Sequence, residues 1–290
     1  MGMNNRQGGL RIWVLLAFVL YAGWYWFSNR SVDPLTGETV MIDKDLSPDQ
    51  EKALGLQSYQ QILQQERPLP ADAKVSKQVE AIAQRLIAKV PEVSDALAAE
   101  HGMQANHVEK SFDWAVTVLQ SDQVNAFCLP GGKMAVYTGL LPVAQNADAV
   151  AVVMGHEISH ALLRHGAQRM TRGKLEQLGQ MAGAASGMDQ STLQTVMSAY
   201  GYGSALPYAR GQESQADELG LMLAAAACFD PREAVPLWQR MNQNADGKST
   251  PEFASTHPSA DTRIQRLQAL MPKALEYRQK FCETASAGMH

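Results

Sequence analysis

The sequence predicts an α+β fold that is mainly α-helical and contains one small antiparallel sheet. Helical patterns precede a group of three short strand-like segments, and helix follows helix from Asn146 onward. Apolar residues make up 46% of the 290 residues, which is ample material for a buried core. The 25 Lys and Arg residues nearly balance the 29 Asp and Glu residues. The chain therefore lacks the basic excess of nucleic-acid-binding proteins and the high net charge of disordered ones.

An apolar run near the N-terminus, Ile12 to Phe27, contains no charged residue. A helix of these 16 residues would be about 24 Å long, a little shorter than the ~30 Å hydrocarbon core of a bilayer. Aromatic residues cluster in Trp24–Phe27, where amphipathic rings suit a membrane interface. We expect an N-terminal transmembrane helix that stays as an anchor. A cleaved signal peptide and a buried helix of a soluble protein are the alternatives.

Arg6 and Arg11 precede the apolar run, whereas acidic residues follow soon after it. This charge bias predicts a single-pass membrane protein whose N-terminus is cytoplasmic and whose remainder lies on the exported, periplasmic side. The parts that we expect are an anchor or signal in 1–28, a polar linker in 29–47 and one folded domain in 48–290.

Ser47 followed by Pro48 is a strong helix start, because serine caps the first turn and proline fits the first helical position. The turn Pro130–Gly132 separates two strand patterns rich in Val, Phe, Tyr and Thr and predicts the small antiparallel sheet. The expected segments are helices at 48–66 and 71–90 and strands at 112–119, 124–128 and 134–138.

The segment His156-Glu157-Ile158-Ser159-His160 has the His-Glu-x-x-His spacing of a zinc site and lies in an apolar helical pattern. On a helix, positions four apart lie on one face about 6 Å apart, so His156 and His160 can bind one zinc ion. Glu157 lies beside them and is the predicted catalytic base. The motif alone leaves one alternative open, namely that two histidines lie on one helix by chance.

A third ligand is predicted in a later helical stretch, where Glu213 is the only downstream Glu with an Asp four residues on. Two histidines and one carboxylate leave a fourth coordination position open, as catalytic zinc sites do. Asp217 is the predicted hydrogen-bond partner of a ligand histidine, most simply His156. Instead of binding metal, Glu213 could simply be an acidic residue that stabilises the N-terminus of its helix. His165 is expected on the surface, because on a continuous helix it lies well around from His160.

The loop Ser255–Ser259 contains His257 and is followed by Arg263. Taken alone, this segment is an ordinary turn that enters a helix. Beside a zinc site, the side chains of His257 and Arg263 would donate hydrogen bonds to an oxyanion. A second role for His257 stays open, namely a fourth zinc ligand that keeps the enzyme latent, because its loop follows the flexible stretch Asp246–Ser249.

With these motifs in this order, the sequence resembles the gluzincin family of membrane-associated zinc metallopeptidases of the HtpX and CAAX prenyl protease type. Within that family it is most similar to the bacterial periplasmic and mitochondrial Oma-like members. The resemblance covers roughly residues 50–272. The segments that carry it are Asn125–Gly132, Tyr137–Leu140, His156–His160, Arg210 with Glu213 to Asp217, and His257-Pro258 with Arg263-Ile264.

The resemblance implies a zincin-like metallopeptidase domain with one zinc ion, whose endopeptidase activity removes misfolded or unfolded proteins at a membrane in protein quality control. It also implies that His257 stabilises the oxyanion with support from Arg263. An edge strand with the residues Asn125, Ala126 and Phe127 would bind an extended protein or peptide substrate through main-chain hydrogen bonds.

The competing function is a zinc-bound chaperone or adaptor for envelope proteins with weak proteolysis. No nucleic-acid partner is expected.

The glycine-rich stretch Gly179–Ser204 contains one acidic residue and predicts either a mobile lid or a loosely packed helical hairpin. In an exported domain two spare thiols tend to pair, and we expect a Cys228–Cys282 disulfide. Cys128 is expected to be buried as a small apolar residue. Three free thiols are the alternative.

Overall fold

The computed structural model describes residues 11–245, 257 and 262–283. The expected flexible stretch Asp246–Ser249 and the loop neighbours of His257 lie outside the described residues. The chain forms two compact units, which we call the small unit and the large unit. The small unit contains the described residues up to Val32, together with Thr39–Asp45 and Ala167–Ala209. The large unit contains Asp33–Glu38, Leu46–Gly166 and the described residues from Arg210 on.

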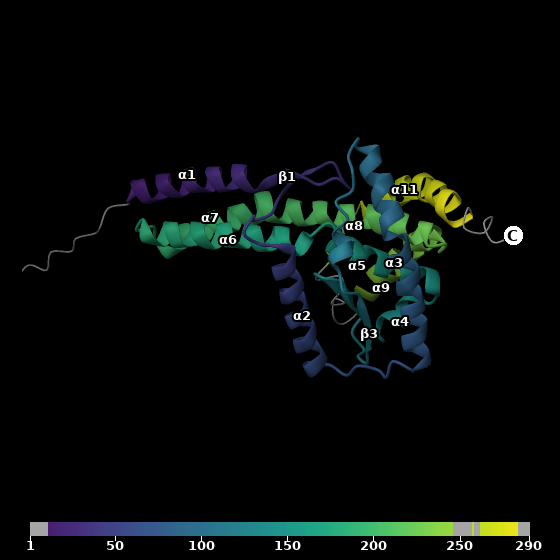
Figure 1. Cartoon of the computed structure of the whole chain (residues 1–290). Helices are drawn as coiled ribbons and strands as arrows, with labels where there is room; N and C mark the ends of the chain where they lie inside the picture. Colours follow the sequence, from purple (N-terminus) through teal and green to yellow (C-terminus); the bar gives the residue numbers. More distant parts are fainter. Residues whose placement is uncertain (1–10, 246–256, 258–261, 284–290) are drawn as a thin grey trace, which may run out of the picture. The chain divides into compact units, whose positions relative to one another are not determined.

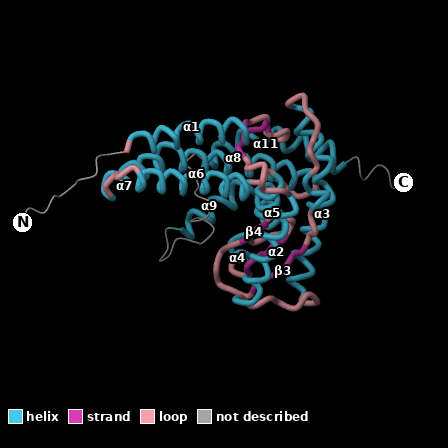
Figure 2. The backbone as a smooth tube through the Cα atoms, turned by 60° about the vertical axis from the view of Figure 1, so that its left-hand side comes forward, coloured by secondary structure: helices cyan, strands magenta, loops and turns pink. Residues whose placement is uncertain are grey.

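The small unit combines an N-terminal helix, a β-hairpin and a helical hairpin (Figures 1 and 2). Its elements are α1 (Ile12–Asn29), β1 (Arg30–Val32), β2 (Thr39–Met41), α6 (His165–Ala185) from residue 167 on, α7 (Gln190–Tyr200), the π-helix η2 (Gly201–Ala205) and the start of α8 (Leu206–Ala226). Strands β1 and β2 pair antiparallel inside the segment expected to be a polar linker. The stretch Gly179–Ser204, expected to be either a mobile lid or a helical hairpin, forms a helical hairpin.

Helix α1 is the one helix among the described residues that is long and apolar enough to cross a membrane. Only Tyr25 and Asn29 are buried in it. Large apolar side chains point outward instead, with Trp13 exposed to 68% and Leu20 to 75%. The expected apolar N-terminal helix is therefore present.

The large unit contains the three-stranded sheet and the remaining helices (Figure 1). Its further elements are α2 (Pro48–Gln65), α3 (Lys74–Glu100), η1 (Val108–Ser111), β3 (Ala115–Leu119), β4 (Ala126–Leu129), β5 (Lys133–Tyr137), α4 (Leu140–Ala144), α5 (Ala147–Leu162), η3 (Pro231–Glu233), α9 (Ala234–Ala245), α11 (Arg263–Arg278) and the π-helix η4 (Gln279–Glu283). The mainly helical α+β class is confirmed. Both predicted early helices are present as α2 and α3, and Ser47 caps α2 in a capping box with Gln50.

The sheet of the large unit has the strand order β3-β5-β4. Strands β4 and β5 pair antiparallel around the predicted turn, in which Gly131 and Gly132 have φ angles of +80° and +81°. Strands β3 and β5 pair in parallel, so the antiparallel expectation holds for one strand pair and not for the other. The chain reverses once before β4 and again before β5. The strand that returns beside β3 is therefore β5, and it runs in the same direction as β3.

Helix α5 passes through the core of the large unit. All residues from Ala149 to Leu162 are buried in it. Two glycines allow the backbones of α5 and α8 to approach closely, because a Cβ on Gly155 would lie 2.7 Å from the carbonyl oxygen of Gly220. A Cβ on Gly220 would lie 2.6 Å from the backbone nitrogen of His156. This contact brings the side chains of α8 within reach of those on α5.

A disulfide joins Cys228, just after α8, to Cys282 in η4, with a Cα–Cα distance of 5.1 Å. The expected bridge is therefore present. It connects positions 54 residues apart, and a cross-link of that span stabilises by about 4 kcal/mol in the chain-entropy model. Cys128 is buried and unbridged, as expected. Burial raises the pKa of its thiol well above the ordinary value.

Candidate active site

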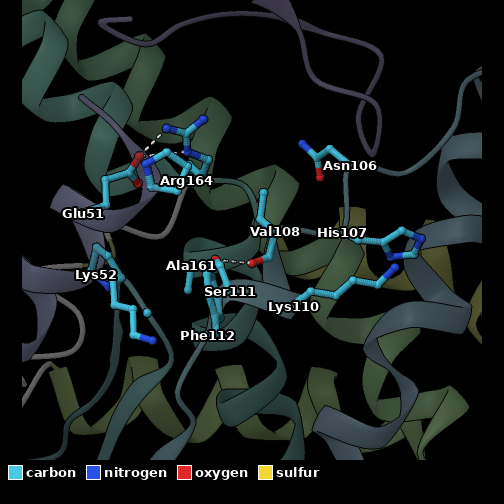
Figure 3. Close-up of a pocket in the computed structure, with 13 residues that line it drawn as sticks. Glu51, Lys52, Asn106, His107, Val108, Lys110, Ser111, Phe112, Ala161 and Arg164 are labelled. Atoms are coloured by element: carbon cyan, nitrogen blue, oxygen red, sulfur yellow. Dashed lines mark hydrogen bonds and ion pairs between the residues drawn. The ribbon is translucent and has the colours of Figure 1, made fainter. Parts of the chain in front are cut away.

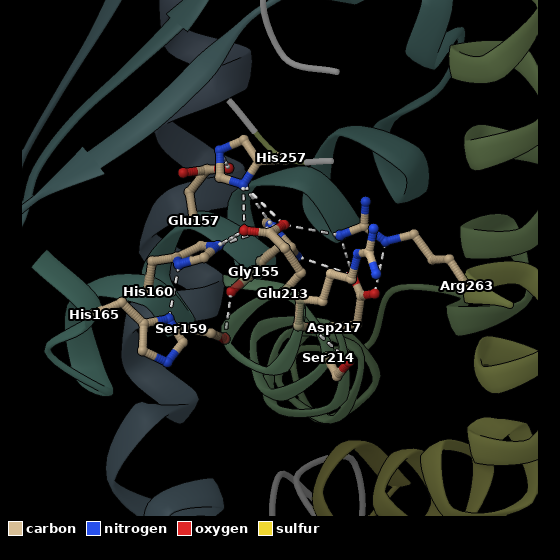
Figure 4. Close-up of polar contacts among 12 residues, drawn as sticks. Gly155, Glu157, Ser159, His160, His165, Glu213, Ser214, Asp217, His257 and Arg263 are labelled. Atoms are coloured by element: carbon tan, nitrogen blue, oxygen red, sulfur yellow. Dashed lines mark hydrogen bonds and ion pairs between the residues drawn. The ribbon is translucent and has the colours of Figure 1, made fainter. Parts of the chain in front are cut away.

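Helix α5 carries the two motif histidines, His156 and His160, one turn apart. Figure 4 shows His160 beside Glu213 and His257. The Nε2 atoms of His156 and His160 lie 3.1 Å from each other. Glu157 follows His156 on the same helix and is 3% exposed. At this Nε2–Nε2 distance, either one ring donates an N–H to the other, or both lone pairs face a cation.

Helix α8 adds two carboxylates from its large-unit part. The Glu213 oxygens lie 3.3 Å from His156 Nε2 and 3.4 Å from His160 Nε2. Asp217 Oδ1 lies 3.0 Å from His156 Nδ1 on the opposite side of the ring. The structure thus brings together the residues expected to bind the metal, and it places Asp217 behind His156 where the sequence analysis expected it.

The hydrogen bond to Asp217 determines which nitrogen of a neutral His156 carries the proton. A carboxylate accepts, so Nδ1 of His156 must donate to Asp217. The other nitrogen, Nε2, then presents its lone pair to Glu213 and His160. This is the arrangement in which a histidine binds a metal while a carboxylate orients its ring.

His165 orients the ring of His160 in the same way. The sequence had not indicated this role. The residue is fully buried rather than on the surface. Its Nε2 lies 2.9 Å from the side-chain oxygen of Gln215, so Nε2 donates and Nδ1 accepts. His165 Nδ1 lies 2.8 Å from His160 Nδ1, which therefore donates and leaves Nε2 of His160 as a lone pair.

The wrong expectation for His165 has a simple cause. It assumed one continuous helix beyond His160, but α5 ends at Leu162 and Arg164 adopts a left-handed φ of 53°. The chain turns there, and His165 returns to the face of α5 that carries His160. Gln215 is itself fixed, because its amide nitrogen donates to Glu38 at 2.7 Å.

The electrostatics of the cluster favour a bound cation. Burial lowers the pKa of His156, but hydrogen bonds to Asp217 and Glu213 outweigh it and raise that pKa to about 9. Burial and the charges of His156 and His165 lower the pKa of His160 well below its ordinary value. Burial raises the pKa of Glu213, yet hydrogen bonds from His156 and His257 outweigh it and lower the pKa. Glu213 therefore stays ionised, and a positive charge beside it is stabilised.

His257 completes the cluster from the C-terminal part of the chain. Its Nδ1 lies 3.0 Å from Glu213 Oε2 and 3.3 Å from His156 Nε2. Its Nε2 lies 3.4 Å from Oε1 of Glu157. The ligand atoms of the four residues His156, His160, Glu213 and His257 all lie within 4.8 Å of one another. Three imidazole nitrogens and one carboxylate at this spacing fit a divalent metal ion.

Arg263 lies behind the carboxylates and is 3% exposed. Its Nε donates to Asp217 at 2.7 Å, and one terminal nitrogen donates to Glu213 at 3.1 Å. The guanidinium also stacks over the ring of Trp238, 3.7 Å from its centroid. Its other terminal nitrogen, Nη1, is buried and has no hydrogen-bond partner among the described residues. Arg263 thus holds both carboxylates in place.

The model of peptidase family M48 matches residues 84–271 of the chain. The mitochondrial metalloendopeptidase OMA1 of Schizosaccharomyces pombe is 32% identical over 266 residues, and the match covers 90% of this chain and 72% of that protein. The chain belongs to peptidase family M48. This confirms the resemblance on which the sequence analysis relied.

Two further relatives of this M48 peptidase come from different lineages. The mitochondrial metalloendopeptidase OMA1 of Homo sapiens is 36% identical over 180 residues. The β-barrel assembly-enhancing protease of Yersinia pestis is 27% identical over 231 residues. The matches cover 34% and 43% of these two proteins, so the chain spans less than half of their length. The family shows that the chain is a metalloendopeptidase, and the side-chain cluster has the ligand types that a metal ion needs.

Strand β4 is an edge strand of the sheet and contains two of the three expected substrate-binding residues. The backbone oxygen of Asn125 accepts a hydrogen bond from Tyr137, so residue 125 faces β5 and the next residue faces the free edge. The backbone N–H of Ala126 is directed there and donates to the side-chain oxygen of Asn125 at 2.9 Å. The Phe127 ring packs on Tyr137, with 6.3 Å between the ring centroids.

A cavity of about 400 Å³ lies where β4 and α5 end (Figure 3). Pro130 and Gly131 of the β4–β5 turn line it, together with Ala161 directly after His160. Lys52 and Lys110 also line it, whereas Arg164 in its wall pairs with Glu51. The cavity could not be predicted from the sequence, because its walls come from four segments that are far apart in the chain.

His165 is expected to position His160, one of the predicted metal ligands. The variant His165→Leu removes the acceptor for His160 Nδ1 and should weaken metal binding about 10- to 100-fold, as loss of such partners does. His165→Asn should retain most of the affinity, because the amide oxygen of asparagine lies where Nδ1 of histidine lies. Competition titration with a chromophoric chelator measures both. The matched control is His101→Ala on the exposed surface, and equal affinity in His165→Leu and this control would contradict the role.

Proposed function

We propose that this M48 peptidase is a zinc-dependent endopeptidase that cleaves unfolded or misfolded protein segments at a membrane. The observation that carries the proposal is the buried cluster in which two imidazole nitrogens and a carboxylate converge beside Glu157. Family membership supports a peptidase over a zinc-bound chaperone or adaptor. The relatives named for the mitochondrion and for β-barrel assembly support work beside a membrane.

The donor set supports zinc as the metal. His156, His160 and Glu213 are two imidazoles and one carboxylate, which is the ligand set of catalytic zinc sites. When bound, zinc supplies a Lewis acid that polarises the scissile carbonyl and makes water acidic enough to attack at neutral pH. Asp217 and His165 keep the two imidazoles turned so that their Nε2 lone pairs face the ion.

Glu157 and Arg263 are the groups proposed to transfer protons and to stabilise negative charge. Glu157 is directed into the site and takes the proton of the attacking water, then returns it to the leaving amine. Arg263 supports the stabilisation of the oxyanion, because its guanidinium donates to Glu213 and Asp217 and keeps both carboxylates in place.

The free edge of β4 provides the binding mode for substrate. An extended peptide adds to the edge at Ala126 by main-chain hydrogen bonds, and the Asn125 side chain must first release the Ala126 N–H. Main-chain recognition requires an extended, unpaired segment and ignores most side chains. This supports unfolded protein as the substrate class.

His257 supports a latent state of the same site. Its Nδ1 lies in the same cluster as the three proposed ligand atoms, so it would occupy the coordination position that water and substrate need. The ring must move aside before a peptide is cleaved. The donor role for His257 is the alternative, and it requires that the ring stay in the site throughout turnover.

Helix α1 is proposed to anchor the chain in one pass, with the large unit on the exported, periplasmic side. A reporter enzyme fused after His290 should then be active only on that side of the membrane. Alkaline carbonate should leave the chain in the membrane pellet, because an integral helix is not extracted. Activity of the reporter in the cytoplasm, or release of the chain by carbonate, would show that the proposed topology is incorrect.

Glu157→Gln should keep zinc and lose proteolysis, because the ligands stay and the proton acceptor is removed. A loss of about 100-fold or more in casein cleavage is expected. Metal analysis and casein cleavage on the same preparation measure the two effects. The matched control is Glu218→Gln, a half-exposed glutamate on α8 that pairs with Lys273. Casein cleavage at the wild-type rate by Glu157→Gln would refute the assignment of the base.

His257→Ala should bind one zinc ion and cleave casein at least as fast as the wild type, because the latch is removed while three ligands remain. Initial rates at saturating casein, together with zinc content, measure this. A decrease in kcat of about 100-fold at full zinc content would instead identify His257 as an oxyanion donor.

A further inference from the structure

A groove in the small unit lies between α1 and the α6–α7 hairpin. Its volume is about 340 Å³, more than twice that of an engineered apolar cavity of about 150 Å³ that binds benzene. Glu176 is the only charged side chain among the described residues that line it. The apolar side chains that form its walls include Leu15, Phe18 and Ala22 of α1, Leu175 of α6, and Leu193 and Met197 of α7.

The hairpin accompanies α1 along its whole length (Figures 1 and 2). At the start of α1, the backbone N–H of Arg11 donates to the carbonyl of Ser186 at the hairpin tip, 2.6 Å away. At its end, Tyr25 and Lys174 both bind Asp43, at 2.7 Å and 2.6 Å. If α1 crosses a bilayer, the groove therefore lies at the depth of the acyl chains.

The hairpin carries almost no charge beside the groove. From Gln177 to Ala209, the only Asp, Glu, Lys or Arg is Asp189, which caps α7 at the tip. Gly179 and Gly183 have the four-residue spacing that lets membrane helices pack closely. A Cβ on Gly179 would lie 3.0 Å from the Phe18 ring, so the missing side chain is what allows α1 to approach α6.

A cation lies beside the groove at its interfacial end. The guanidinium of Arg172 donates to Ser204 at 2.8 Å and to the hydroxyl of Tyr200, a groove residue, at 3.3 Å. Arg172 forms no ion pair with a carboxylate among the described residues. Its neighbour Thr171 accepts from the backbone N–H of Asp43, which places both at the aromatic end of α1. A guanidinium at this level matches the phosphate of a lipid headgroup.

We propose that the groove binds one acyl chain of an anionic membrane phospholipid, with Arg172 at the lipid phosphate. The inference rests on the anchorage of α1 proposed above. A volume of 340 Å³ suits a hydrocarbon chain and not a second protein helix, because a single helical turn about 10 Å wide and 5.4 Å long already occupies about 420 Å³. The bound lipid fills the space between α1, α6 and α7 and joins the hairpin to the anchor.

The test uses the full chain in a neutral detergent, with native mass spectrometry after addition of phosphatidylglycerol or phosphatidylcholine. Wild-type chain should retain phosphatidylglycerol in preference to phosphatidylcholine. Ala22→Trp fills the groove and should weaken retention of both lipids about tenfold or more, a change of about 1.4 kcal/mol. Its matched control is Ala17→Trp, the same change on the exposed part of α1 outside the groove.

Arg172→Gln should abolish the preference for phosphatidylglycerol, whereas Arg169→Gln, an exposed cation on the same helix, should keep it. Inorganic phosphate should not displace the lipid, because the acyl chain provides most of the binding. Equal retention by Ala22→Trp and Ala17→Trp, or an unchanged preference in Arg172→Gln, would overturn the proposal. Displacement of the lipid by a hydrophobic helical peptide but not by added phospholipid would overturn it as well.

The same preparations distinguish this inference from the proposed function. Carbonate-resistant membrane retention and casein cleavage are measured for each variant beside lipid binding. If both persist in a wild-type chain that retains no phospholipid, only the lipid site is wrong. If carbonate extracts the chain, the anchorage is wrong, whatever lipid binds in detergent.

Discussion

Two hydrogen bonds behind the imidazoles, from His156 to Asp217 and from His160 to His165, determine what the rest of the site can do. Each takes up the Nδ1 proton of one ring, so in the neutral rings both Nε2 lone pairs face the side of Glu213. Without them, either ring could rotate or change tautomer, and the lone pairs would not converge. The burial of α5 makes this arrangement rigid, because a buried ring has few other partners to bind.

The partners of both histidines come from α8 and the start of α6, so the site depends on how closely these elements approach α5. The contact of Gly155 with Gly220 brings the backbones of α5 and α8 together, and the left-handed Arg164 returns His165 to His160. Arg263 then compensates the two carboxylates that α8 brings into the core. The disulfide at the end of α8 ties the C-terminal segment to the same helix.

The sequence predicted the parts of the site that depend on regular helical spacing. His156 and His160 are one turn apart, and Glu213 and Asp217 repeat that spacing on a second helix, so each pair shares a face. It did not predict His165, because that position depends on where α5 ends. The mainly helical α+β class followed from the pattern of segments, but the parallel pairing of β3 with β5 did not. Strand order depends on contacts across the sheet that no local pattern records.

The central claim is that the buried cluster is a zinc site whose ligands are imidazoles and a carboxylate. X-ray absorption at the zinc edge on the full-length chain tests it most directly. The account predicts one zinc per chain with only nitrogen and oxygen neighbours, and one imidazole fewer in His257→Ala than in the wild type. Sulfur among the neighbours, or zinc retained in full by a chain that lacks both His156 and His160, would contradict it.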